Sequence, residues 1–211
     1  QYTSSQVSSG KLLNAGASLI SNQNKYGVNA LMMYSNAALE SWWGQSQIAM
    51  DKNNLFGHGA ADNNPYYGAN GYSSVDDCIQ YHAKVFISES YCDPKDYIGR
   101  YYGSHLGDKE SGINVKYASD PYWGEKAASF YYHLDEDGID QEKNPIKTIQ
   151  LSKDLKVYAP NKKDVLYTYK KGNIVSIHIL KNEIGYYKIS SEAPVKDNDL
   201  NVNSKYKNSY V

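Results

Sequence analysis

Residues 37–44 read Ala37-Ala38-Leu39-Glu40-Ser41-Trp42-Trp43-Gly44. The apolar spacing that leads into them predicts a helix from about residue 29 to residue 43, with Gly44 as its stop. Glu40 is the only charged residue between Lys25 and Asp51. Burial against apolar and Trp side chains, together with the negative end of the helix dipole, predicts a raised pKa for Glu40. Such a carboxyl group is suited to general acid catalysis, and the alternative is a surface Glu without a chemical role.

The chain around this helix is expected to be helical as far as residue 134. Apolar residues recur at Leu12, Leu13, Ala17 and Ile20, and further helices are predicted over residues 74–89 and 122–134. Residues 53–72 are rich in Gly, Asn and Tyr and predict loops and a short hairpin. We therefore expect an α+β body in which a small irregular lobe covers a helical core.

The pattern changes to a period of two in the last third of the chain. Short β-type runs are predicted over residues 156–158, 165–168, 173–177 and 185–189, which suggests a small all-β barrel. Residues 199–202 (Asp-Leu-Asn-Val) echo residues 154–157 (Asp-Leu-Lys-Val). The chain is therefore expected to end either in a polar tail or in the start of a further repeat.

Charge divides the chain at the same place. Residues 1–147 carry 11 Lys and Arg against 17 Asp and Glu, a net charge of −6, whereas residues 148–211 carry 11 against 6, a net of +5. The acidic stretch 135–142, followed shortly by Pro145, is typical of a linker. We predict a catalytic domain over residues 1–137, a linker over 138–147, a barrel over 148–192 and the tail or repeat over 193–211.

The composition favours a carbohydrate ligand. The chain holds 22 Tyr against 3 Phe and 3 Trp, and a ring with a polar tip matches the apolar face and the hydroxyl rim of a sugar. Ordinary core packing is the alternative for each Tyr. No run of eighteen apolar residues exists that could span a membrane. The sequence starts at Gln1 without a signal peptide, so secretion has to be argued indirectly.

Other chemistries find little support. The five histidines show no pair at metal-ligand spacing, and no glycine-rich phosphate loop is present, so we expect neither a metal nor another cofactor. Cys78 and Cys92 have no His at a spacing that suggests a thiol protease. We expect two free thiols, because fourteen residues of continuous helix would hold them far apart.

Five ordered blocks resemble the glucosaminidase domain of bacterial autolysins, glycoside hydrolase family 73. The blocks cover roughly residues 8–135 and lie at 38–49, 53–57, 62–66, 87–91 and 117–123. The first contains Ala38-Leu39-Glu40-Ser41, and the last is Tyr117-Ala118-Ser119-Asp120-Pro121-Tyr122-Trp123. The resemblance implies a lysozyme-like fold and hydrolysis of the β-1,4 bond between N-acetylglucosamine and N-acetylmuramic acid.

The resemblance also implies site residues. The Glu of Ala-Leu-Glu-Ser in the family is the catalytic acid, which corresponds to Glu40. Asp62 is the first choice for a second carboxylate, with Glu89 and Asp120 as competitors and an Asx-turn as its alternative. Tyr117 corresponds to a family Tyr at the active site, where its hydroxyl could orient a water or the substrate N-acetyl group. Further substrate contacts are expected from Asn54, Phe56, Tyr66, Tyr67, Asp120 and Trp123. The four aromatic residues among them would stack on sugar rings, and the alternative for each is packing in the core.

The C-terminal module resembles bacterial SH3-like domains through Leu155-Lys156-Val157, residues 169–175 and Gly185-Tyr186-Tyr187-Lys188-Ile189. The resemblance implies binding to wall peptides, and the charge of +5 also favours anionic wall polymers. The family pattern usually has Trp where Tyr186 stands.

Together these observations predict a secreted or phage-delivered, monomeric endo-β-N-acetylglucosaminidase that acts on peptidoglycan glycan strands and binds no nucleic acid. Muramidase or lytic transglycosylase action on the same glycan is one alternative. A wall-binding protein without catalysis is another.

Overall fold

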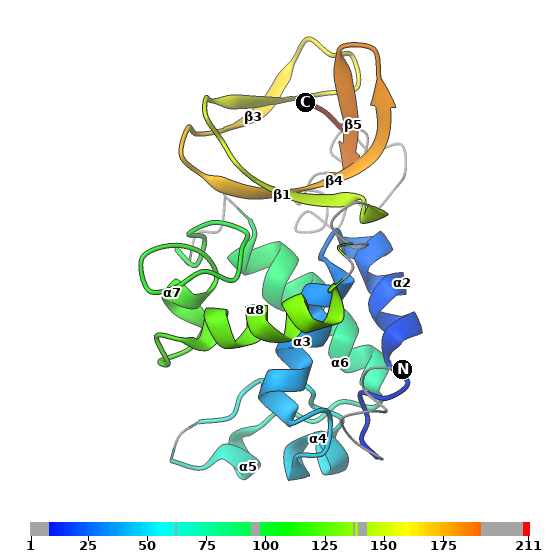
Figure 1. Cartoon of the computed structure of the whole chain (residues 1–211), viewed down its shortest axis with the longest axis vertical. Coiled ribbons are helices and arrows are strands. Elements are labelled where there is room, and N and C mark those ends of the chain that lie inside the picture. The colour runs from blue at the N-terminus through cyan, green and yellow to red at the C-terminus, as the bar shows by residue number, and fades with distance from the viewer. Residues whose placement is uncertain (1–8, 62, 94–97, 137, 139–142, 191–208) are drawn as a thin grey trace.

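The computed structural model describes residues 9–61, 63–93, 98–136, 138, 143–190 and 209–211. A helical part below and an all-β part above follow one another along the chain (Figure 1). The helices are α2 (Gly16–Tyr26), α3 (Ala30–Ser41), α4 (Gln47–Lys52), α5 (Pro65–Gly68), α6 (Val75–Tyr81), the π-helix η1 (His82–Tyr91), α7 (Asn114–Tyr117) and α8 (Trp123–Leu134). The expected fold class, a helical domain followed by an antiparallel barrel, is confirmed.

Helix α3 runs through the core of the helical part, and α8 packs across it (Figure 1). The side chain of Asn29 caps the start of α3 by accepting a hydrogen bond from Met32 N at 2.9 Å. The helix ends at Ser41, two residues before the predicted end, because Trp42 and Trp43 adopt left-handed backbone angles with φ of 50° and 62°. This early turn buries Trp43 in the core and leaves Trp42 exposed.

The helix predicted over residues 74–89 consists of two kinds of helix. Ser74 caps α6 by accepting a hydrogen bond from Asp77 N. From His82 the chain widens into the π-helix η1, which continues to Tyr91. Wider turns are uncommon and are found frequently at functional sites. Here the change begins at a fully buried histidine.

The irregular lobe of residues 53–72 is organised around the buried side chain of Asn54. Its Nδ2 donates to the carbonyl oxygens of His58 and Asn70, at 2.9 and 3.0 Å. Its Oδ1 accepts from the backbone N–H groups of Phe56 and His58. A single amide therefore replaces the regular hydrogen bonds that this loop lacks.

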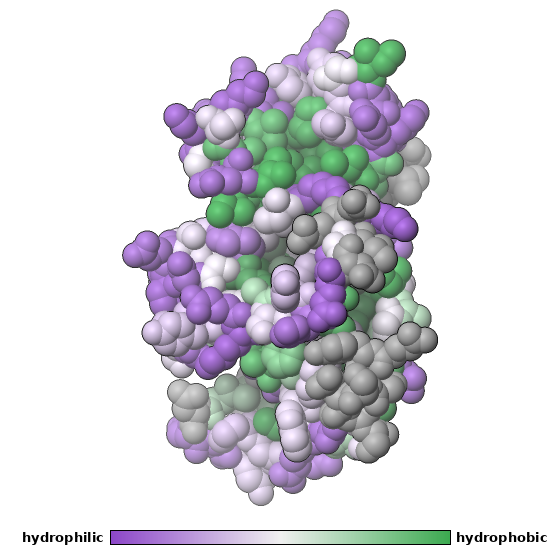
Figure 2. All heavy atoms as spheres, viewed as in Figure 1, coloured by the Kyte–Doolittle hydropathy of each residue, from purple (hydrophilic) through white to green (hydrophobic). Residues whose placement is uncertain are grey.

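The all-β part is one antiparallel sheet of six described strands. They are β1 (Ile146–Gln150), β2 (Leu155–Tyr158), β3 (Val165–Tyr169), β4 (Ile174–Glu183), β5 (Tyr186–Ser190) and β6 (Ser209–Tyr210), in the order β1-β4-β5-β6-β2-β3. The sheet curls into a nearly closed barrel (Figure 1) around Val157, Tyr169, Val175, Ile177 and Ile189. Apolar side chains also gather on the visible face of this part (Figure 2). A hollow in the all-β part is lined by Ile149, Leu155, Ile177 and Ile179.

The strands differ from the expected runs at both ends of the module. Strand β1 begins at Ile146, inside the stretch expected to be a linker, and β6 pairs with β2 and β5 beyond residue 192. The echo at residues 199–202 lies outside the described residues. The two parts are joined by hydrogen bonds, from Asn144 Nδ2 to Gln23 Oε1 and from Ser104 N to Ile174 O.

Replacement of Asn54 by Ala should destabilise the helical part by about 3 kcal/mol, because it leaves buried backbone groups of the lobe without partners. Asn63→Ala in the same lobe is the control and should change the free energy of unfolding by less than about 0.5 kcal/mol, since Asn63 is exposed. Urea denaturation of the two variants measures both values. Equal stabilities would show that Asn54 does not organise the lobe.

Candidate active site

Glu40 lies in the last turn of α3 with its carboxylate at the meeting point of three segments. Trp123, the first residue of α8, donates its indole Nε1–H to Glu40 Oε1 at 2.6 Å. On the lobe side, Gly57 has a φ of 65°, and a Cβ placed on it would lie 3.6 Å from Glu40 Oε2. Helix α3, helix α8 and the lobe therefore converge on one carboxyl group.

The pKa of the Glu40 carboxyl is raised above its usual value. Burial is the larger cause, because it penalises the charged form, and the hydrogen bond from Trp123 partly opposes it. The predicted direction of the shift is confirmed. The Trp that contacts the carboxylate is Trp123, whereas Trp43 packs edge-on against Tyr34 and Phe130 in the core.

Tyr117 stands next to this pair in a cage of aromatic rings. Its ring stacks on Trp123, with centroids 4.2 Å apart and planes 25° apart. Phe86 and Tyr91 meet the same ring at 5.7 and 5.5 Å. Burial, and next the nearby Glu40, raise the pKa of Tyr117 well above its usual value. The Tyr117 hydroxyl therefore stays protonated at neutral pH.

A line of polar side chains leads from Tyr117 back to the lobe. Asn36 Nδ2 donates to Tyr117 Oη at 2.9 Å and lies 3.4 Å from His82 Nε2. His82 Nδ1 is 3.0 Å from His58 Nε2, and His58 Nδ1 is 2.7 Å from Tyr72 Oη. The sequence analysis did not assign these residues to the site. A signal was available, because Asn36 precedes Glu40 by four positions and so shares its face of the helix.

Three residues expected to contact sugar are instead buried. Asn54 is 1 % exposed and uses its amide within the lobe. Phe56 is 3 % exposed and stacks on His82, with ring centroids 3.6 Å apart. Trp123 is 4 % exposed and is engaged by Tyr117 and Glu40. All three side chains are thus engaged within the protein in this structure, and their contact with substrate stays a prediction.

The other expected substrate residues lie nearer the surface. Tyr67 is 81 % exposed, and Tyr66 donates its hydroxyl to Asp51 Oδ2 at 2.9 Å while Lys52 lies over its ring. Both belong to α5 and remain predictions as stacking rings.

The candidate second carboxylates have different surroundings. Asp120 pairs with Lys126 at 2.6 Å and accepts a hydrogen bond from Tyr122 N, and these two contacts hold its pKa below the usual value. Glu89 pairs with Lys84 at 3.3 Å. Asp62 lies outside the described residues, so its role stays a prediction.

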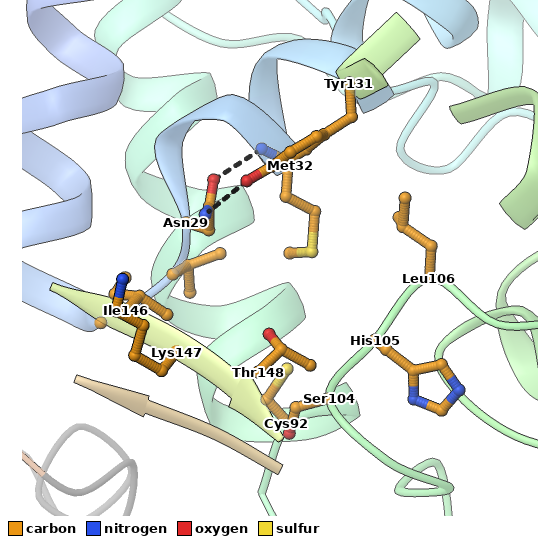
Figure 3. A pocket seen from close by; sticks show the side chains of 12 residues that line it. Asn29, Met32, Cys92, Ser104, His105, Leu106, Tyr131, Ile146, Lys147 and Thr148 are labelled. Atoms are coloured by element: carbon orange, nitrogen blue, oxygen red, sulfur yellow. Dashed lines mark hydrogen bonds between the residues drawn. The ribbon is translucent and has the colours of Figure 1, made fainter. Parts of the chain in front are cut away.

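A separate cavity of about 510 Å³ lies where the helical part meets the barrel, and Figure 3 shows the side chains around it. Asn29 and Met32 border it from the start of α3, Leu106 and Tyr131 from the helical part, and Thr148 from β1. Glu40 lies at the other end of α3, so this cavity is not part of the Glu40 site.

Among the described residues, no cluster of three or more His, Cys, Asp and Glu side chains is placed to hold a metal ion. In the same residues, no helix has the length and apolar character needed to cross a membrane. Cys78 and Cys92 are both buried and do not form a disulfide with each other, as expected.

Comparison with known proteins matches the helical part to the family that the sequence resembles. The family model described as Glucosaminidase, mannosyl-glycoprotein endo-beta-N-acetylglucosaminidase, matches residues 16–136. A candidate endo-β-N-acetylglucosaminidase of Streptococcus pneumoniae is 45% identical over 130 residues, which are 62% of this chain and 18% of that protein. The chain thus spans less than a fifth of the length of that relative.

Solved structures give a weaker likeness. Autolysin E of S. aureus is 26% identical, with a TM-score of 0.48 over 65% of this chain and 64% of that one. The catalytic domain of the autolysin Auto from Listeria monocytogenes is 19% identical, with a TM-score of 0.41 over 59% and 82%. Because the family model covers more than half of the sequence, the chain belongs to the glucosaminidase family.

Proposed function

We propose that this protein is a peptidoglycan hydrolase of the endo-β-N-acetylglucosaminidase type, which cleaves the β-1,4 bond between N-acetylglucosamine and N-acetylmuramic acid. The observation that carries the proposal is Glu40, a carboxyl group with a raised pKa that is fixed by a neutral donor. Membership of the family and the resemblance to the pneumococcal protein support the same activity.

Glu40 would act as the general acid. Its protonated carboxyl transfers a proton to the glycosidic oxygen while the bond to the anomeric carbon breaks. The carboxylate that remains is stabilised by the hydrogen bond from Trp123, which favours the charged form. Burial thus favours the protonated form of Glu40, and the hydrogen bond from Trp123 lowers the free-energy cost of forming the carboxylate.

For the second half of the reaction we propose assistance by water or by the substrate N-acetyl group, with Tyr117 as the orienting group. Tyr117 is protonated and adjacent to Glu40, so it is suited to donate a hydrogen bond. Of the described competitors, Glu89 and Asp120 are each held in an ion pair. A covalent glycosyl-enzyme trapped on Asp62, Glu89 or Asp120 would contradict this proposal.

For the barrel we propose an SH3-like wall-binding role, which implies action at the bacterial cell wall after secretion or delivery by a phage. Tyr158, Tyr186 and Tyr210 form an aromatic cluster on neighbouring strands, with ring centroids 6.4 and 6.3 Å apart. Lys162 lies over two of these rings at 5.0 and 4.5 Å. Lys162 is itself paired with Glu183 at 2.8 Å, so the partly exposed rings suit wall peptides, and the net charge of +5 over residues 148–211 suits anionic wall polymers.

Glu40→Gln should lower the release of new reducing ends from purified peptidoglycan by at least about 10² to 10⁴-fold, because the amide keeps the shape but has no acidic proton to transfer. Glu110→Gln, at an exposed position, is the matched control and should keep full activity. The end group formed by the wild type should be N-acetylglucosamine. A muramic acid or an anhydro end would support muramidase or transglycosylase action instead.

Trp123→Phe should move the alkaline limb of the pH profile of kcat/KM to higher pH. The general acid is active while protonated, so activity falls as pH rises through the pKa of Glu40. Loss of the Trp123 donor removes the contact that lowers this pKa. Trp42→Phe, at an exposed Trp, should leave the limb in place. An unchanged or lower limb in Trp123→Phe would show that this bond does not tune Glu40.

Tyr158→Ala combined with Tyr186→Ala should reduce pelleting of the full chain with wall sacculi by about tenfold, since about 1.4 kcal/mol of lost contact corresponds to that factor. Activity on soluble glycan should be retained. Tyr132→Ala, an exposed Tyr of α8, serves as the control. Equal pelleting of all three proteins would remove the wall-binding role of the cluster.

A further inference from the structure

A row of polar side chains leads away from Tyr117, and its members beyond Tyr117 have no part in the proposed reaction. The row runs from Tyr117 through Asn36, His82 and His58 to Tyr72, and each neighbouring pair lies between 2.7 and 3.4 Å apart. Asn36, His82 and His58 are 3 %, 0 % and 3 % exposed. Polar groups buried so completely are costly unless their hydrogen bonds are made in one consistent pattern.

The amide of Asn36 determines that pattern. Its Nδ2 faces both Tyr117 Oη and His82 Nε2, and its Oδ1 is buried without a partner in the described residues. If the amide were rotated by half a turn, Nδ2 would take the place of Oδ1, and its two N–H donors would be unpaired where now one carbonyl oxygen is unpaired. Orphaned N–H groups are rarer than under-satisfied carbonyl oxygens, so the orientation with Nδ2 toward Tyr117 is favoured.

With Nδ2 as donor, every further proton in the row is assigned. His82 Nε2 has to accept from Asn36, so His82 carries its proton on Nδ1 and donates to His58 Nε2. His58 then carries its proton on Nδ1 and donates to Tyr72 Oη. Phe56 stacks on His82 with an interplanar angle of 1°, which fixes the plane of that ring.

We propose that Asn36, His82 and His58 are positioning residues that orient the Tyr117 hydroxyl. Because this hydroxyl accepts from Asn36, its own proton is left for a hydrogen bond to the substrate or to a water in the Glu40 site. The row thus makes Tyr117 a donor and prevents it from acting as a base. This inference rests on the proposed function for its kinetic consequence, whereas the proton positions do not depend on it.

The raised pKa of Tyr117 agrees with a permanent donor. Burial lowers the pKa of His58 to about 4, and burial together with the neighbouring His58 lowers that of His82. Both rings are therefore neutral at pH 7, as the row requires. The far end of the row, Tyr72, belongs to the lobe that also supplies Gly57 beside Glu40. The row therefore connects the lobe to Tyr117.

Nitrogen-15 NMR of the histidine rings in the full chain tests the proton positions directly. At pH 7, His58 and His82 should both be neutral with the proton on Nδ1, and their signals are assigned through ring contacts to Tyr72 and Phe56. A proton on Nε2 of either ring would mean that the hydrogen bonds of the row point in the opposite direction, with each donor acting as an acceptor. In that case the Tyr117 proton points to Asn36, and the proposal is overturned.

A double-mutant cycle on purified glycan tests the kinetic consequence. Asn36→Asp keeps the shape but turns a donor into an acceptor, so the Tyr117 proton should turn away from the site. The expected result is a fall in kcat of about 10² to 10³-fold with little change in KM, as for loss of one preorganised donor. When Tyr117 is already replaced by Phe, adding Asn36→Asp should lower kcat by less than a further factor of about three.

The control is Asn22→Asp, because Asn22 is a buried Asn of α2 that bonds to Ser18 O. It should lower stability without changing kcat. Additive effects of Asn36→Asp and Tyr117→Phe would show that Asn36 does not act through Tyr117. If the wild type releases no sugar from any glycan, the proposed function fails, while the NMR result still decides the proton positions.

Discussion

The hydrogen bond from Trp123 Nε1 to Glu40 Oε1 is the interaction on which the rest of the site depends. It joins the last turn of α3 to the first residue of α8 through two residues that are 83 positions apart in sequence. Burial raises the pKa of Glu40 because it penalises the charged carboxylate. The neutral indole N–H of Trp123 partly opposes this shift without adding a formal charge. The packing of α8 across α3 is therefore what brings this donor to Glu40.

The same constraint explains why the surrounding aromatic side chains are buried. Tyr117 stacks on Trp123, and Phe86 and Tyr91 contact other sides of the same ring. The widened helix η1 contributes both of these rings and also begins with His82. A regular α-helix over the same residues would present side chains at a different spacing. The π-helix is therefore the element that brings the aromatic cage and the buried histidine to the same end of α3.

The sequence alone predicted the helix that carries Glu40, the raised pKa of that residue and the change from helices to strands. Those features follow from local periodicity and from one isolated charge. The roles of Trp123, Phe56 and Asn54 could not be predicted in the same way, because a ring that stacks on sugar and a ring that packs on His82 look alike in sequence. The end of α3 was missed since nothing in the pattern indicates left-handed backbone at Trp42 and Trp43. Strand β6 was missed because two residues carry no detectable period.

The titratable groups around Glu40 affect the stability of the fold in opposite directions as pH changes. The pKa of Glu40 is raised in the folded chain, so its contribution to stability is present at low pH and is lost as pH rises through that pKa. His58 and His82 have lowered pKa values, so their contribution is present above the usual histidine value of 6.5 and is lost as pH falls. For His58, with a pKa of about 4, the loss between pH 7 and pH 4 is about 3 kcal/mol. Low pH therefore destabilises the fold at His58 and His82, and high pH destabilises it at Glu40.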